Sequence, residues 1–162
     1  MILMDLTGGY KMGYAMKIIK KDAIIIFVMG ALYMVLEGLW RGWTNISMLV
    51  VGGLCGFLIG KLNKQPDFYR KIWEQCLIGM LIVLVIEFIS GMILNVFLQF
   101  GIWDYSNIWG NFYGQICIPY AILWFLLVPL VIYVDDYLRF RLFEEEEPQE
   151  LLKNYKNLFL GR

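Results

Sequence analysis

The sequence predicts an all-α polytopic membrane protein, a bundle of four transmembrane helices with both the N and C termini in the cytoplasm. Two observations lead to this fold class. Hydrophobic residues make up 60% of the 162 residues and aromatic residues 17%, whereas soluble domains contain about 45–50% apolar residues. The 14 basic and 14 acidic residues balance, but most of them gather at the two ends and in one central segment, as a lipid bilayer requires.

Four apolar runs define the predicted helices. A helix needs about 20 mostly apolar residues to cross a bilayer. They cover residues 22–40, 46–62, 73–100 and 116–137. Residues 22–140 are therefore expected to form the membrane domain. Before it, residues 1–21 form a basic segment that we expect to be weakly structured or interfacial. After it, the tail over 141–162 is acidic and then amphipathic, which predicts a short cytoplasmic surface helix.

Lysine and arginine residues set the predicted orientation. The N-terminal segment, the 61–73 loop and the region after Arg139 are basic, whereas the 101–115 loop contains no basic residue. Because basic loops stay in the cytoplasm, the 101–115 loop is expected outside. Arg41, in the outer turn, is the one exception. Tryptophan and tyrosine residues near both boundaries fit the aromatic belts of a bilayer.

Missing residue types exclude several kinds of chemistry. The chain has no histidine, which is the commonest metal ligand and a frequent general base. Cys55, Cys76 and Cys117 are isolated in apolar runs and are interpreted as buried reduced thiols. No G-x-x-x-x-G-K-[S/T] loop is present, so ATP-driven activity would need a separate ATPase subunit. We predict no metal site, no cofactor and no nucleic-acid partner, and an enzyme is the less favoured class.

Glycines mark one face of the second predicted helix. Gly52, Gly56 and Gly60 recur at four-residue steps, and small residues let helix backbones approach closely in lipid. This face predicts tight packing against a neighbouring helix of the same chain. A homodimer seam is the alternative.

Glu87 is the most informative residue because it lies well inside the third apolar run. A charged side chain near the bilayer centre costs about 2.5–3.5 kcal/mol on insertion scales, so such groups usually face a bundle interior or a water-filled cavity. Gly91, Asn95 and Gln99 follow at four-residue steps and predict a polar stripe that could line a path. The alternative is a protonated Glu87 that hydrogen-bonds to a neighbouring helix as a structural contact.

Two further polar features lie toward the outside. Glu37 and Arg41 are spaced i, i+4 and predict an ion pair, although Arg41 could instead meet Asp104 or an anionic ligand. The outer loop is unusually polar and aromatic, with Trp103, Asp104, Tyr105, Ser106, Asn107, Asn111 and Gln115. Asp104 is suited to cap a turn by accepting backbone N–H bonds, and a ligand-contacting role is the alternative.

Several of these residues carry a family resemblance. They are Arg41-Gly42, Ser47-Met48, Gly52-Gly53, Glu87-Phe88-Ile89-Ser90-Gly91, Asn95, Trp103-Asp104-Tyr105-Ser106-Asn107, Asn111, Gly114-Gln115-Ile116-Cys117 and Asp135-Asp136-Tyr137-Leu138-Arg139. Over roughly residues 24–145 the chain resembles the small bacterial membrane proteins described as putative ABC-transporter type IV, or ABC transporter permease. The resemblance implies a multi-pass protein of the bacterial cytoplasmic membrane with a transport role. No long cytoplasmic loop offers a coupling helix for an ATPase.

Three functions follow, in order of preference. The first is a transporter or channel-like component with a polar intramembrane cavity around Glu87, with Gly91, Asn95, Arg41 and Glu37 along the path. The second is a non-transporting membrane module that binds a lipid, peptide or larger complex through the 101–115 loop. The third is a membrane enzyme that uses carboxylates. The expected partners are membrane lipid, a second copy of the chain and a separate ATPase subunit.

Overall fold

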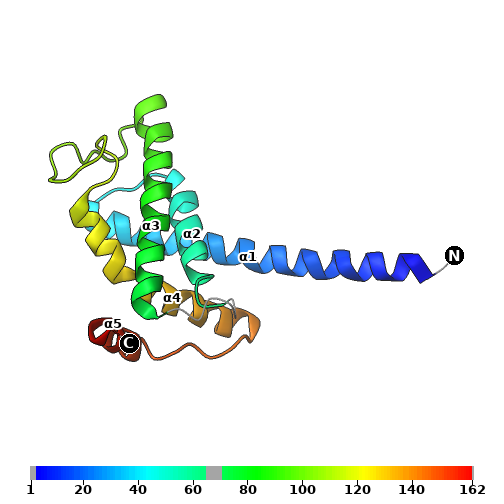
Figure 1. The fold of residues 1–162 in the computed structure, drawn as a ribbon. Coiled ribbons are helices and arrows are strands. Elements are labelled where there is room, and N and C mark those ends of the chain that lie inside the picture. The colour runs from blue at the N-terminus through cyan, green and yellow to red at the C-terminus, as the bar shows by residue number, and fades with distance from the viewer. Residues whose placement is uncertain (1–2, 65–70, 162) are drawn as a thin grey trace.

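The fold is helical throughout the part of the chain that the structure describes. The computed structural model describes residues 3–64 and 71–161, with side chains from residue 15 onward. Within these ranges the only strand-like pairing is an isolated bridge between Phe112 and Ile116. The elements, shown in Figure 1, are α1 (Leu3–Arg41), α2 (Ser47–Gly60), α3 (Ile72–Gly91), the π-helix η2 (Met92–Phe97), α4 (Ile118–Phe143) and α5 (Leu151–Leu160).

Three of the described helices are long and apolar enough to cross a membrane. They are Ala15–Arg41, Ile72–Phe97 and Ile118–Phe143. α2 is apolar but has only 14 residues, fewer than the about 20 that span a bilayer. The predicted all-helical fold is therefore confirmed, with three described helices capable of spanning a membrane, and the second predicted run forms a shorter helix.

α1 begins earlier than predicted. One continuous helix runs from Leu3 to Arg41, so the described backbone before residue 22 is helical and not weakly structured, while its interfacial placement stays a prediction. No proline interrupts this segment, and an interior glycine costs a helix only about 1 kcal/mol relative to alanine. In Figure 1 the N-terminal part of α1 extends away from the other helices. The predicted 61–73 loop lies partly outside the described residues, because 65–70 are not described.

α3 and η2 together end before the predicted limit at Phe100. The last helical residue is Phe97, and Gln99 and Gly101 then take φ angles of 56° and 59°. Left-handed conformations of this kind end a helix and turn the chain. The loop over residues 98–117 therefore begins immediately after η2. It is named the outer loop below, after the side that the sequence predicts for it.

α4 is longer than predicted and contains two differently placed prolines. It runs from Ile118 to Phe143, rather than ending at Tyr137. Pro119 lies in the first turn, where no backbone N–H is needed for the helix. Pro129 lies inside the helix, where it removes one backbone hydrogen bond and favours a kink.

Glycines hold α1 and α2 together at backbone distance. A Cβ atom on Gly30 of α1 would collide with the carbonyl oxygen of Leu49, and one on Gly53 of α2 would collide with that of Ile26. Such contacts between a helix and a backbone carbonyl of its neighbour form only where the first helix has a glycine at the crossing. The two helices therefore form a tight antiparallel hairpin.

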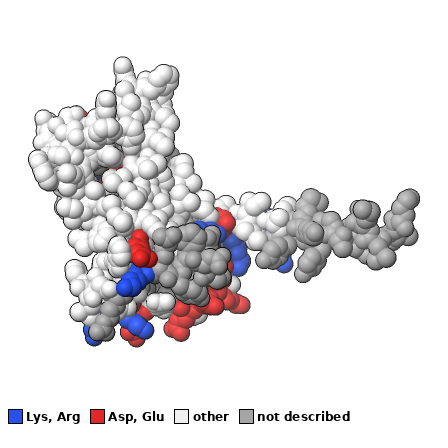
Figure 2. All heavy atoms as spheres, viewed as in Figure 1, with Lys and Arg blue, Asp and Glu red and all other residues white. Residues whose placement is uncertain are grey.

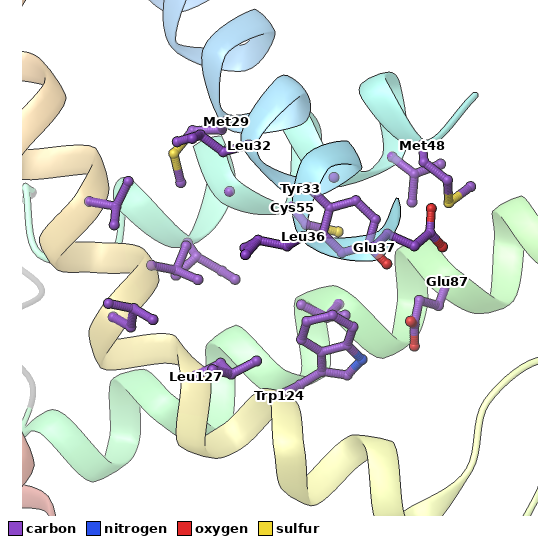
Figure 3. A pocket seen from close by; sticks show the side chains of 18 of the residues that line it. Met29, Leu32, Tyr33, Leu36, Glu37, Met48, Cys55, Glu87, Trp124 and Leu127 are labelled. Carbon is purple, nitrogen blue, oxygen red and sulfur yellow. The ribbon is translucent and has the colours of Figure 1, made fainter. Parts of the chain in front are cut away.

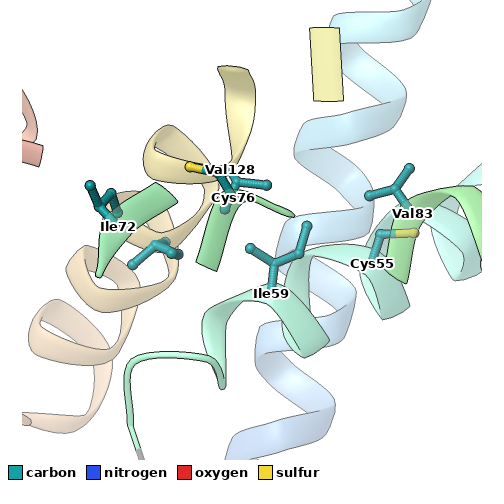
Figure 4. Close-up of a cluster of buried hydrophobic side chains, with 7 residues drawn as sticks. Cys55, Ile59, Ile72, Cys76, Val83 and Val128 are labelled. Carbon is teal, nitrogen blue, oxygen red and sulfur yellow. The ribbon is translucent and has the colours of Figure 1, made fainter. Parts of the chain in front are cut away.

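A hydrophobic core joins α2, α3 and α4, and is shown in Figure 4. Its buried members are Cys55, Ile59, Ile72, Cys76, Val83, Val128 and Ile132. Cys55 and Cys76 are free thiols here, and Cys117 is also free and buried. The thiols pack as small apolar side chains in this core.

Charged side chains gather at one end of the bundle, as Figure 2 shows. At this end Asp135 and Arg139 of α4 are 0% and 4% exposed. Arg139 Nε lies 2.8 Å from Asp135 Oδ2, and Lys64 Nζ lies 3.4 Å from the same oxygen. Asp22 of α1 lies 3.7 Å from the Arg139 guanidinium. This buried ion cluster explains why α4 continues past Tyr137, because both ionic residues sit on the helix and are paired there.

α5 docks against the bundle instead of standing free. The Tyr155 hydroxyl donates a hydrogen bond to the carbonyl oxygen of Leu126 at 2.9 Å, and Leu158 packs against the hydrophobic core. Asn154 is buried in the same contact. Burial of the Tyr155 side chain raises the pKa of its phenol, so the phenol is neutral and keeps its proton for this bond.

Candidate functional site

A cavity of about 310 Å³ lies between α1, α2, α3 and α4. Its size falls at the lower end of the about 300–1,000 Å³ that small-molecule pockets occupy. Most of its wall is aliphatic, from Met29, Leu32, Val35, Leu36, Met48, Val51, Ile59, Val83, Leu127, Val128, Leu130, Val131 and Val134. In Figure 3 the polar and aromatic side chains Tyr33, Glu37, Glu87 and Trp124 lie together toward one end. The cavity therefore has a polar end and an apolar end.

The cavity reaches the outer surface of the bundle beside α1. Val35 and Leu36 both line it, and they are 59% and 64% exposed. On the opposite side α4 contributes Leu127, Leu130 and Val131. The mouth therefore lies between two helices that are long and apolar enough to cross a membrane.

Glu87 lies on the wall of the cavity near the end of α3. Its side chain is buried, and its Oε2 atom has no hydrogen-bond partner among the described residues. The indole N–H of Trp124 points toward the carboxyl group in Figure 3 and interacts with it, although without the full geometry of a hydrogen bond. A buried carboxylate oxygen without a donor is costly. Glu87 is therefore positioned to accept a hydrogen bond from a bound molecule.

Glu37, by contrast, has its partners inside the protein. Its carboxylate lies 2.7 Å from Arg41, and the Thr44 hydroxyl donates a hydrogen bond to its second oxygen. Arg41 also donates to the carbonyl of Ile102 and lies over the ring of Trp43 at 4.7 Å. Arg41 thus bridges α1 to the outer loop, and its described contacts do not include Asp104.

Aromatic side chains enclose the polar end of the cavity. Tyr33 of α1 and Trp124 of α4 have ring centroids 6.2 Å apart, and both line the cavity with Trp103 and Tyr105 of the outer loop. Burial raises the pKa of the Tyr105 phenol, so this group stays neutral. Tyr33 and Trp124 were not among the predicted site residues, because an aromatic residue in an apolar helix indicates core packing as readily as a ligand contact.

The predicted polar stripe divides at the π-helix. Gly91 lies directly against the Gln115 side chain, and Asn95 donates a hydrogen bond to Gln115 Oε1 at 2.9 Å while accepting one from Ile102 N at 2.7 Å. Neither Gly91 nor Asn95 lines the cavity. Gly91 and Asn95 therefore both face Gln115 instead of the cavity, and Gln99 falls on the exposed turn beyond η2. The hydrogen bonds of Asn95 to Gln115 and Ile102 join the outer loop to η2.

The outer loop is held by its own hydrogen bonds. Asp104 accepts bonds from the Ser106 hydroxyl and from the Ser106 N–H, the latter at 2.8 Å, and these two bonds hold the pKa of Asp104 below its ordinary value. Asn111 donates to the carbonyls of Ser106 and Ile108, each at 3.0 Å. Asp104 and Asn111 therefore build the loop.

The Trp103–Asn107 motif faces two ways. Trp103 and Tyr105 line the cavity, whereas Asp104, Ser106 and Asn107 are exposed. The Trp103 indole donates a hydrogen bond to the Gln115 carbonyl at 3.0 Å, which closes the loop over the cavity's polar end. Trp103 and Tyr105 thus form part of the cavity wall, and Asp104 and Ser106 form a turn held by their own hydrogen bonds.

The glycine face of α2 is covered within the chain. A Cβ on Gly52 would meet the ring of Tyr33 at 2.5 Å, and one on Gly56 would meet Met29 at 2.8 Å. Gly60 lies against the buried Asp135 carboxylate. Gly52 and Gly56 also line the cavity, so small residues here leave room for both the α1 contact and the open space.

Comparison with known proteins adds one match. Residues 19–153, most of the chain, match the model of a family described as "Putative ABC-transporter type IV". No curated protein and no solved structure matches the chain.

Proposed function

Because the chain belongs to the putative ABC-transporter type IV family, we propose that it is a membrane-embedded transport component whose substrate site is the cavity beside Glu87. The observation that carries this proposal is the buried Glu87 oxygen without a donor on the cavity wall. An acidic group sheltered inside an apolar helix bundle is the usual mark of a substrate or ion pathway. The cavity keeps Glu87 buried, and a substrate would enter it through the mouth beside Val35 and Leu36.

The proposed topology has four crossings, with both termini in the cytoplasm of the bacterial plasma membrane. Lys61 and Lys64, which follow α2, share one end of the bundle with Asp22 and Arg139, and the 101–115 loop contains no basic residue. α2 is about 21 Å long, against a hydrocarbon thickness of about 30 Å. Its flanking turns and local thinning of the bilayer would complete the crossing.

The proposed partners are a separate ATPase and a second copy of the chain. The sequence has no nucleotide-binding loop of its own, and the family description is compatible with an ATPase on another chain. Gly52, Gly56 and Gly60 are buried against α1 and α4, so a second copy would use another face. The exposed apolar sides of α1, α3 and α4 are available for such contacts.

Substitution of Glu87 tests the transport role. Proteoliposomes loaded with a pH-sensitive dye report proton movement when amines, amino acids, sugars or metal ions are added on one side. We expect protein-dependent flux for the substrate class, and Glu87→Gln should lower its rate about tenfold or more, because a hydrogen bond to a charged group is worth about 1.5–3 kcal/mol. Glu74→Gln, on the same helix but away from the cavity, is the matched control.

Equal flux in the wild type and Glu87→Gln would remove Glu87 from the mechanism. Absence of protein-dependent flux from the chain reconstituted together with its ATPase would instead favour the second function, a binding module. That alternative has its own support, since Trp109, Phe112 and Tyr113 are 75%, 53% and 72% exposed on the outer loop. Exposed aromatic side chains on a structured loop are typical of surfaces that bind lipid, peptide or protein.

A further inference from the structure

We propose that the molecule bound in this cavity is a hydrophobic ammonium compound, with one hydrocarbon body and one positively charged amino group. The inference rests on the proposed function, since it assigns the substrate class of the same cavity. Three features support it: the unpartnered carboxyl group at the polar end, the aromatic rings around it, and the aliphatic wall of the rest of the cavity.

The polar end of the cavity has one more carboxyl group than its arginine can pair with. Glu37, Arg41 and Glu87 line the cavity, and two carboxylates face one guanidinium. Arg41 and Thr44 satisfy Glu37, whereas Glu87 Oε2 has no donor among the described residues. The other ionisable lining residues are Tyr33, Cys55 and Tyr105, which carry no positive charge, and α4 contributes no charged lining residue. A single cationic donor would complete this end.

The aromatic rings suit the same cation. Tyr33, Trp103, Tyr105 and Trp124 line the cavity together with Glu87, and Figure 3 shows Tyr33 and Trp124 on either side of the space in front of the carboxylates. The faces of tyrosine and tryptophan rings attract ammonium groups, most strongly when water is excluded. Aromatic faces combined with a carboxylate therefore favour an ammonium over a carboxylate or phosphate ligand.

The remaining wall fits a hydrocarbon body. Aliphatic residues of α1 and α4 form much of the remaining cavity wall, and two of them, Val35 and Leu36, are exposed at its mouth. A molecule dissolved in the bilayer can enter there without passing through water. The ammonium group could belong to a free hydrophobic amine or to the headgroup of an aminophospholipid.

Three ten-carbon probes separate the chemistry of the headgroup from that of the chain. Decylamine is protonated at pH 7, as alkyl amines titrate near the lysine value, whereas decanol is neutral and decanoate is negative. Equilibrium binding of each radiolabelled probe is measured with the full chain in phosphatidylcholine nanodiscs. We expect decylamine to bind about tenfold or more tightly than decanol, and decanoate to bind least.

Variants locate the binding to the cavity. Glu87→Gln should weaken decylamine binding about tenfold or more while leaving decanol nearly unchanged, with Glu74→Gln as the matched control. Leu36→Trp should weaken decylamine and decanol together by filling the mouth. Leu39→Trp is its control, because Leu39 is 80% exposed on the same helix and does not line the cavity. Both tryptophan variants place the new side chain at an exposed position, so folding is preserved.

The outcomes separate this inference from the proposed function. Equal binding of the three probes, or decylamine binding that survives Glu87→Gln, would overturn the ammonium assignment even if another solute is transported. Decylamine binding that depends on Glu87, with no flux from the chain reconstituted together with its ATPase, would support the assignment and remove the transport role. Nanodiscs with phosphatidylethanolamine decide the source: competition supports an aminophospholipid ligand, and its absence supports a free hydrophobic amine.

Discussion

Replacing Arg139 with methionine is expected to lower the free energy of unfolding by about 3–5 kcal/mol, the cost of leaving one charge of a buried pair without its partner. Asp135 is fully buried and lies 2.8 Å from Arg139. Without Arg139, its remaining ionic contact is with Lys64 at 3.4 Å. Unfolding in mixed micelles, followed by circular dichroism as the fraction of denaturing detergent rises, measures the change.

Two companion variants make the Arg139 result specific. Arg141→Met changes an exposed arginine of the same helix, and should alter stability by less than about 0.5 kcal/mol. The double variant Asp135→Asn with Arg139→Met should recover part of the loss, because both charges of the pair are then absent. A single Arg139→Met variant as stable as Arg141→Met would show that the ion cluster is hydrated.

Gly30→Val is expected to destabilise the α1–α2 hairpin by about 1–3 kcal/mol, toward the upper end of the range for overpacked sites. The new Cβ would collide with the backbone carbonyl of Leu49. A backbone oxygen cannot rotate away as a side chain can, so the two helices must separate. The same unfolding measurement in mixed micelles applies.

Gly38→Val controls for the intrinsic effect of valine in a helix. Gly38 lies on the same helix, and a Cβ there would have no neighbour within 4 Å. The difference between the two variants therefore reports the helix contact alone. Equal stability of Gly30→Val and Gly38→Val would mean that α1 and α2 do not pack as described.

Local patterns in the sequence predicted several features that the structure contains. Glu37 and Arg41, spaced i, i+4 on α1, lie 2.7 Å apart. Glu87 is buried among helices, as the cost of an acid in hydrocarbon requires. The Glu37–Arg41 pair depends on a short spacing, and the burial of Glu87 depends on one large energetic cost. Spacing and cost can both be recognised in the sequence alone.

Other features depend on contacts that a linear sequence does not display. Gly91 and Asn95 contact Gln115 of the outer loop, a partner 20 or more residues further along the chain. Tyr33 and Trp124 meet only once α1 and α4 are packed. The long first helix was missed because its basic, glycine-containing start has no hydrophobic run to mark it.

The account depends most directly on Glu87 lying in a cavity that lipid-soluble molecules can reach. Dicyclohexylcarbodiimide, a carboxyl reagent that partitions into bilayers, tests this in intact membranes, with modified peptides mapped by mass spectrometry. We expect modification at Glu87, slowed by Leu36→Trp at the cavity mouth but not by Leu39→Trp. An unmodified Glu87, or one that reacts faster with a water-soluble carbodiimide, would contradict the account.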